Sequence, residues 1–139
     1  MNRVPIAALS LLLLAGLPEG ARGAARTWDG SASSDWFDAD NWDPAGIPAA
    51  GDEVTIGSGT ALLTADTPAL ASLSLTGTLV FSNWNTTLSA AEVTVGVGGV
   101  MTCAGPFTDT QMSNNVVVVC SNLTILANGK ILADRKGYS

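Results

Sequence analysis

The sequence predicts an all-β fold, a short right-handed parallel β-solenoid, from a pattern that recurs four times. The pattern is an apolar residue, a hydroxyl residue and an apolar residue, at 54–56, 73–75, 93–95 and 123–125. The segments start 19, 20 and 30 residues apart, and a glycine followed by another apolar residue comes after each. Such alternation is typical of half-buried strands, and the interspersed glycines and β-branched residues argue against helices.

The recurring unit, a strand, a glycine bend and a second strand, has the composition that one solenoid coil requires. Coils stacked about 4.8 Å apart would bury a continuous apolar stripe. We therefore assign residues 53–139 to the coils. A β-sandwich is the alternative, because evenly spaced short strands also suit that fold. The bends precede the second strands as Gly59 with Leu62, Gly77 with Leu79, Gly99 with Val100, and Gly129 with Ile131.

Residues 1–23 have the anatomy of a secretory signal peptide. Arg3 precedes an apolar run, and the small residues Ala21 and Gly23 stand at the minus-three and minus-one positions of a cut before Ala24. The apolar run is shorter than the roughly 20 residues of a membrane span. We expect a secreted or cell-surface protein, periplasmic in transit, that has no membrane span after cleavage.

The remaining chain is acidic and contains no histidine. From Ala24 onward it carries eleven acidic and four basic residues, and this charge disfavours nucleic acid as a partner. The absence of histidine removes the commonest general base and the usual zinc ligand. No set of residues compels catalysis, so we expect no catalytic residues, no bound cofactor and no enzyme activity, and hold a polysaccharide lyase or hydrolase fragment as a remote alternative.

Two cysteines, Cys103 and Cys120, bracket the longest interval between repeats. In an exported chain an even pair predicts a disulfide. Two buried free thiols remain the alternative. We interpret residues 103–120 as an inserted flap with an extra strand at 116–119, which the disulfide would hold in place.

Residues 24–52 precede the first repeat and are rich in tryptophan. A solenoid exposes the apolar interior of its first coil, so a terminal cap is expected. The aspartates, glycines and prolines between the aromatic residues are turn formers. The expected structural cap consists of Trp28, Trp36, Phe37, Trp42 and Ile47.

The spacing of this cap resembles the opening of secreted bacterial β-helix proteins, the autotransporter-like or surface-anchored adhesins. The resemblance rests on Trp28-Asp29-Gly30, Asp35-Trp36, Asn41-Trp42, Gly46-Ile47-Pro48 and the segment 51–56, and the coil motif recurs near 128–138. It implies a β-helix with an adhesive or structural role. Those proteins continue through many further coils, so we expect a fragment or a short relative with an open last coil.

Two ligand classes remain open. Calcium is a weak candidate, because neither Asp29 nor Asp38 starts a run with the EF-hand ligand spacing, so we expect no metal site. A surface polysaccharide is the second, since Trp84, flanked by Asn83 and Asn85 in a polar loop, could stack on a sugar ring.

We therefore predict an exported structural or adhesive cell-surface protein. Its partners would be a second copy or a longer surface protein, docked through the open C-terminal coil by strand addition. The alternative function is a carbohydrate-binding module or a fragment of a polysaccharide-active enzyme.

Overall fold

The computed structural model describes residues 22–83, 85–105 and 115–133, which form an all-β domain. The all-β prediction is confirmed, since the described elements are strands and one short 3-10 turn, η1 (Ala39–Asn41). The predicted signal peptide falls almost entirely on residues 1–21, which lie outside the described ranges. Among the described residues no helix has the length and apolar character needed to cross a membrane.

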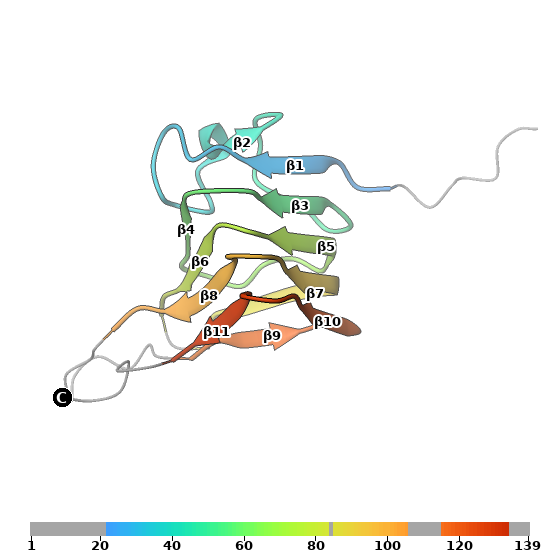
Figure 1. The fold of residues 1–139 in the computed structure, drawn as a ribbon. Helices are drawn as coiled ribbons and strands as arrows, with labels where there is room; N and C mark the ends of the chain where they lie inside the picture. The colour runs from blue at the N-terminus through green and yellow to red at the C-terminus, as the bar shows by residue number, and fades with distance from the viewer. Residues whose placement is uncertain (1–21, 84, 106–114, 134–139) are drawn as a thin grey trace, which may run out of the picture.

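The strands form two sheets, and chain segments alternate between them (Figure 1). The larger sheet has the order β10-β7-β5-β3-β1-β2, with β9 also paired to β7. The smaller sheet has the order β11-β8-β6-β4. The larger sheet contains β1 (Ala25–Trp28), β2 (Trp42–Asp43), β3 (Glu53–Ile56), β5 (Leu70–Leu75), β7 (Thr87–Val95), β9 (Val117–Val119) and β10 (Asn122–Ile125), and the smaller contains β4 (Thr60–Leu63), β6 (Thr78–Phe81), β8 (Val100–Cys103) and β11 (Lys130–Leu132).

The four repeated triplets lie side by side in parallel register. Val54 is opposite Leu73, Leu73 is opposite Val93, and Val93 is opposite Leu123. The third residue of each triplet follows the same register, from Ile56 to Ile125. Apart from β1 with β2, the strand pairings among the described residues are parallel. The sequence repeat therefore marks successive layers of one sheet.

The smaller sheet repeats this arrangement with its own column of inward residues. Ala61, Leu79 and Met101 are opposite one another and fully buried. Leu62 and Val100, the apolar residues that the sequence pattern singled out after Gly59 and Gly99, are only partly buried and lie next to this column. In these two layers the buried residue is therefore the neighbour of the one singled out: Ala61 precedes Leu62, and Met101 follows Val100.

The glycine bends pack directly on the layer before. A methyl group added at Gly99 would overlap the Leu75 carbonyl oxygen, and one added at Gly129 would overlap the Val95 carbonyl oxygen. At these two corners the backbone therefore approaches the preceding layer more closely than a side chain allows. This close approach explains why a glycine recurs between the paired strands.

The C-terminal part of the predicted flap at 103–120 belongs to the larger sheet. Its described part includes β9, which pairs in parallel with the first half of β7, from Thr87 with Val117 to Ser89 with Val119. β10 then pairs with the second half of the same strand, and Ser121 donates a backbone hydrogen bond to Ala91 between them. Residues 117–125 thus follow the nine-residue strand β7 along its length. The central part of the flap, 106–114, lies outside the described residues.

We predict that the inward triplet positions carry most of the stability of the layers. Leu73→Ala should lower the free energy of unfolding by about 2–5 kcal/mol, because the side chain is 1% exposed and its removal leaves a cavity. The neighbouring Ser74→Ala, on the exposed face of the same strand, should change it by less than about 0.5 kcal/mol. Urea denaturation monitored by tryptophan fluorescence measures both, and equal effects would contradict the assignment of the two faces.

Candidate functional site

Three tryptophans pack together at the β1–β2 end of the domain. Trp28, Trp36 and Trp42 have exposed fractions of 4%, 0% and 2%. The ring of Trp42 makes edge-to-face contacts with both others, at centroid distances of 5.0 Å to Trp28 and 4.8 Å to Trp36. Phe37 is half-buried against this cluster. Ile47 differs from the expectation, because its side chain is 43% exposed and the adjacent Pro48 is buried instead.

The indole nitrogens of this cluster are unequally satisfied. Trp42 Nε1 donates to the Trp36 carbonyl oxygen at 2.8 Å. Trp36 Nε1 is buried and makes no hydrogen bond within the described structure. The cluster is therefore held by apolar packing and ring contacts, and its rings are not presented to solvent as a sugar platform would be.

Asn41 organises the turns that carry the tryptophans. Its side chain is fully buried, and Oδ1 accepts hydrogen bonds from the backbone N–H groups of Ala32 and Ser33, at 2.9 and 2.7 Å. Its Nδ2 donates to Ser33 Oγ and to the Asp35 carbonyl oxygen, both at 2.9 Å. The Asn41 carbonyl oxygen accepts from Asp29 N–H at 2.9 Å. Both the oxygen and the nitrogen of this buried amide are therefore hydrogen-bonded, as buried polar groups usually are, and all of its partners lie in the loop 32–35.

The cap also closes the edges of both sheets. β1 pairs with β3 in parallel and with β2 in antiparallel orientation, so the larger sheet ends at the short strand β2. The free edge of β4 is covered by the loop before Trp36. Leu62 N–H donates to Ser34 O at 2.7 Å, and Trp36 N–H donates to Leu62 O at 3.0 Å. Few backbone groups are left unpaired at this end.

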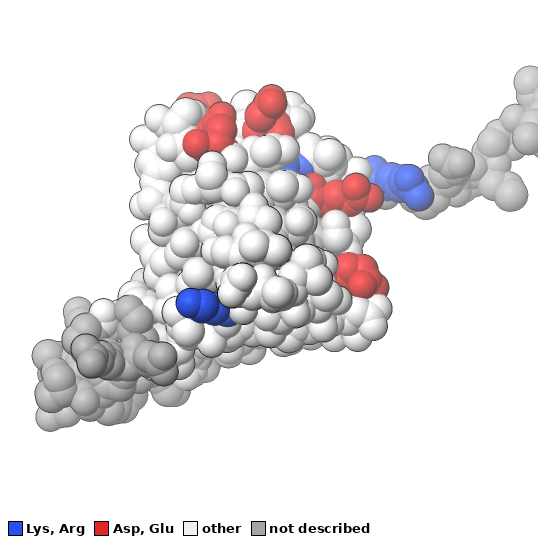
Figure 2. Space-filling view, viewed as in Figure 1, with Lys and Arg blue, Asp and Glu red and all other residues white. Residues whose placement is uncertain are grey.

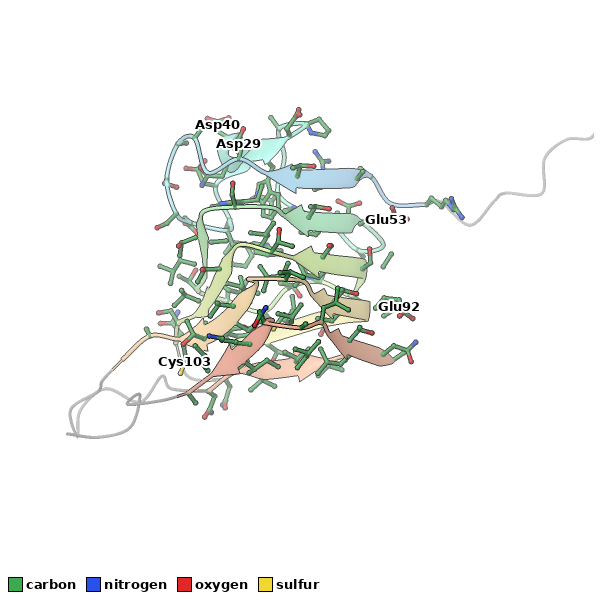
Figure 3. The ribbon with its side chains drawn as sticks, in the orientation of Figure 1. Asp29, Asp40, Glu53, Glu92 and Cys103 are labelled. Carbon is green, nitrogen blue, oxygen red and sulfur yellow. The ribbon has the colours of Figure 1, made fainter. Side chains whose placement is uncertain are left out.

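The aspartates of the cap serve its turns. Asp29 accepts from Ser31 N–H at 2.8 Å, Asp35 from Phe37 N–H at 3.0 Å, and Asp38 from Asp40 N–H at 3.2 Å. Acidic side chains gather at the β1–β2 end of the face in Figure 2, and Figure 3 places Asp29 and Asp40 there. In the described residues no three acidic, histidine or cysteine side chains come together as a possible metal site.

Asp52 is a buried carboxylate that joins the cap to the first layer. Its exposed fraction is 3%, and it lies just before β3. Oδ1 accepts from Ala24 N–H at 2.7 Å, and Oδ2 accepts from Ala49 N–H at 2.8 Å and from Arg26 Nε at 3.5 Å. Burial by itself raises the pKa of Asp52, but the hydrogen bonds from Ala49, Ala24 and Arg26 together lower it below the ordinary value of 3.8.

Arg26 extends this network to the turn after β2. Its Nη1 donates to the carbonyl oxygens of Pro44 and Ala45, at 2.7 and 3.1 Å. The guanidinium therefore connects the turn at 44–45 with the carboxylate of Asp52. Neither residue is aligned with a second acid or base in the manner of a catalytic pair.

The opposite end of the domain is open. Among the residues that the structure describes, β10 and β11 are the last strands of their sheets, and their apolar residues continue the buried columns with no described strand beyond them. In the column that starts at Val54, exposure is 1% at Val54, Leu73 and Val93 and 45% at Leu123. Ile125 and Ile131 end the neighbouring columns with exposed fractions of 47% and 39%. This end is a cross-section through the core, and we call Leu123, Ile125, Leu126 and Ile131 the open face.

The two cysteines are free thiols, so the structure does not contain the predicted disulfide. Cys103 ends β8 in the smaller sheet and is buried against the core, near the lower left of Figure 3. Cys120 follows β9 on the larger sheet. The disulfide was inferred from the even number of cysteines in an exported chain, whereas in the structure Cys103 ends a strand of the smaller sheet and Cys120 follows a strand of the larger one.

Cys120 lines a shallow pocket of about 400 Å³ between β5, β7 and β9. The lining carries no charged side chain. It consists of Ala69, Leu70, Ser89, Ala90, Ala91, Val119, Cys120 and Ser121.

The predicted glycan patch is described only in part. Asn83 and Asn85 are exposed and adopt left-handed backbone conformations, with φ of 72° and 64°. The Asn83 amide donates to the Thr64 carbonyl oxygen, which fixes the loop to the preceding layer. Trp84, on which sugar stacking depended, lies outside the described residues.

Fold and site together define a small all-β domain of parallel strand layers, closed at one end and open at the other. A family model for the G8 domain matches residues 41–121, which is more than half of the chain. The chain therefore belongs to the G8 domain family. No curated protein and no solved structure matches it.

The family match corrects the resemblance drawn from the sequence. The G8 domain occurs in eukaryotic and bacterial proteins and is not specific to autotransporter-like β-helix adhesins. The tryptophan-rich opening was taken as the mark of those adhesins, but the match begins only at Asn41, after Trp28 and Trp36. The assignment to that group was therefore wrong.

We predict that Asn41 is essential for the stability of the cap. Asn41→Ala removes the partners of two N–H groups and of the Asp35 carbonyl, and should lower the free energy of unfolding by more than about 2 kcal/mol. Asp40→Asn, an exposed change in the adjacent position, should alter it by less than about 0.5 kcal/mol. Thermal melts give both values, and an unaffected Asn41→Ala protein would show that the loop does not need this amide.

We predict that Asp52 makes the domain less stable in acid. Because its pKa is lowered in the folded state, its stabilising effect is present above pH 3.8 and is lost as the pH falls below that value. Asp52→Asn should therefore be less stable than the unchanged protein at pH 7, and the difference should shrink below pH 3.8. Denaturation curves between pH 2 and 7 test this, with Asp43→Asn as an exposed control; a difference independent of pH would contradict it.

Proposed function

We propose that this chain is an exported structural and adhesive domain of the cell surface that acts by docking and performs no catalysis. Its two sheets would be the faces of a short right-handed β-solenoid. The passage from β3 through β4 to β5 supports this reading, because it returns to the same sheet by way of the other sheet, as one coil does. The G8 family match is compatible with such a domain and assigns it no activity.

The observation that carries the docking proposal is the exposure of the open face. Leu123 and Ile125 end two columns of the larger sheet, and Ile131 ends a column of the smaller sheet. In the three preceding layers the residues at the same positions are at most 1% exposed. Contiguous apolar side chains at an unpaired sheet edge are a recognised interaction surface. The exposed backbone groups of β10 and β11 offer hydrogen bonds to the same partner.

A second copy of this chain is the partner that the charges favour. Among residues 115–133 the only charged side chain is Lys130, so two open faces can meet with little repulsion. The cap end is unsuitable, because residues 24–52 carry six aspartates and one arginine and the sheet edges there are covered. The proposed contact is therefore between like ends and related by a two-fold axis, which makes the facing edge strands antiparallel.

We predict a dimer that forms through the open face. Light scattering after size-exclusion chromatography, over a range of concentrations, should show a monomer–dimer equilibrium. Ile125→Lys should raise the dissociation constant at least tenfold, because it places a charge in the apolar contact. Val97→Lys is the matched control, since Val97 is 63% exposed in the turn between β7 and β8 and should not affect association.

Two results would contradict the dimer. One is a monomer at every concentration, which would leave the open face to a different occupant. The other is equal association of the Ile125→Lys and Val97→Lys proteins, which would place any contact elsewhere on the surface.

A further inference from the structure

The start of β1 is fixed against Asp52 at a single backbone atom. Ala24 N lies 2.7 Å from Asp52 Oδ1, and the Ala24 carbonyl oxygen accepts from Glu53 N–H at 2.9 Å. These contacts hold Ala24 in the register that β1 and β3 follow, with Ala25 opposite Glu53. Ala24 itself is exposed, whereas the carboxylate it contacts is 3% exposed. A buried acceptor thus faces the backbone nitrogen of a surface residue.

That nitrogen belongs to the residue that follows the predicted cut. The small residues Ala21 and Gly23 direct an export protease to the bond between Gly23 and Ala24. Gly23 also lies against the backbone of the turn before β3, where an added methyl group would overlap the Gly51 carbonyl group. A side chain at position 23 is therefore disfavoured in the folded chain, and the small residue there also suits the predicted cleavage site.

We propose that Asp52 is the binding site for the α-ammonium group that processing creates at Ala24. Hydrolysis breaks the bond between the Gly23 carbonyl carbon and Ala24 N. Water supplies the hydroxyl group that completes the Gly23 carboxyl group and the proton that completes the Ala24 amine. At neutral pH the carboxyl group loses its proton and the amine gains one, so a neutral amide donor becomes a cation beside the Asp52 carboxylate.

The surroundings favour this ion pair. Oδ1 faces Ala24, while Oδ2 is already engaged by Ala49 N–H and, at 3.5 Å, by Arg26 Nε. The ionised groups near the new terminus are therefore Asp52, Arg26 on β1, and the exposed side chain of Glu53 on β3. A charged donor strengthens a hydrogen bond that is already short and aligned. Cleavage would thereby anchor the first strand of the larger sheet.

This inference rests on the export that belongs to the proposed function and is independent of docking by the open face. The first experiment expresses the full chain in an exporting host and determines the N-terminus of the secreted product by mass spectrometry. Ala24 is the expected terminus. A secreted product that starts at another residue would overturn the proposal, whatever its state of association.

The second experiment titrates the α-amino group of the processed protein by NMR. An ordinary α-amino group titrates near pH 8, with a pKa of about 7.7–8.0. The neighbouring carboxylate should raise the pKa of Ala24 above that range, and Asp52→Asn should return it there. Asp43→Asn, which removes an exposed carboxylate, is the control and should leave the pKa raised. Equal titration with and without Asp52 would overturn the ion pair.

A third measurement avoids any change at Asp52. N-terminal acetylation of the chain that starts at Ala24 restores a neutral amide, and the melting temperature at pH 7 should fall by about 5 °C. Above the raised pKa the ammonium loses its proton, so the difference should vanish at high pH. Identical melting of the two proteins at pH 7 would contradict the proposal, even if Asp52→Asn fails to fold.

Discussion

The parallel ladder between successive layers is the constraint on which the rest of the structure depends. Each strand of the larger sheet is held by backbone hydrogen bonds to the strand one layer before, in a register that places Val54, Leu73, Val93 and Leu123 in one column. A slip of one residue would turn every apolar side chain outward. The corner glycines preserve this register, because Gly99 and Gly129 let the backbone of one corner rest on that of the last.

A stack of layers has two ends, and this chain treats them differently. At the first end, three indole rings fill the interior, Asn41 satisfies the turns, and the cap pairs with the edges of β3 and β4. At the other end, Leu123 and Ile125 continue the columns into solvent. The two ends therefore differ in how far their apolar side chains are exposed to solvent. The cap buries the apolar interior of the first layer, whereas the last described layer leaves its apolar side chains exposed.

The sequence was sufficient for the features that follow a repeating apolar pattern. The strands at the four triplets and the burial of Trp28, Trp36 and Trp42 belong to this class. The sequence was insufficient to decide which of two adjacent apolar residues is buried. The spacing after Gly59 does not decide whether Ala61 or Leu62 faces inward, and Pro48 is buried where Ile47 was expected. The roles of Asn41 and Asp52 were also missed, since buried polar residues have no periodic signal and are explained only by their partners.

The order of the layers has a kinetic consequence. The cap is stabilised largely by contacts within residues 24–62, and each later strand pairs with a strand that precedes it in the chain. Because parallel pairing joins segments that are distant in sequence, each closure is slow, but the partner of each later strand always lies earlier in the chain. A chain that folds from its N-terminus therefore has a template for each new segment. We expect assembly to proceed from the tryptophan cluster toward β11, with the newest edge always the reactive one.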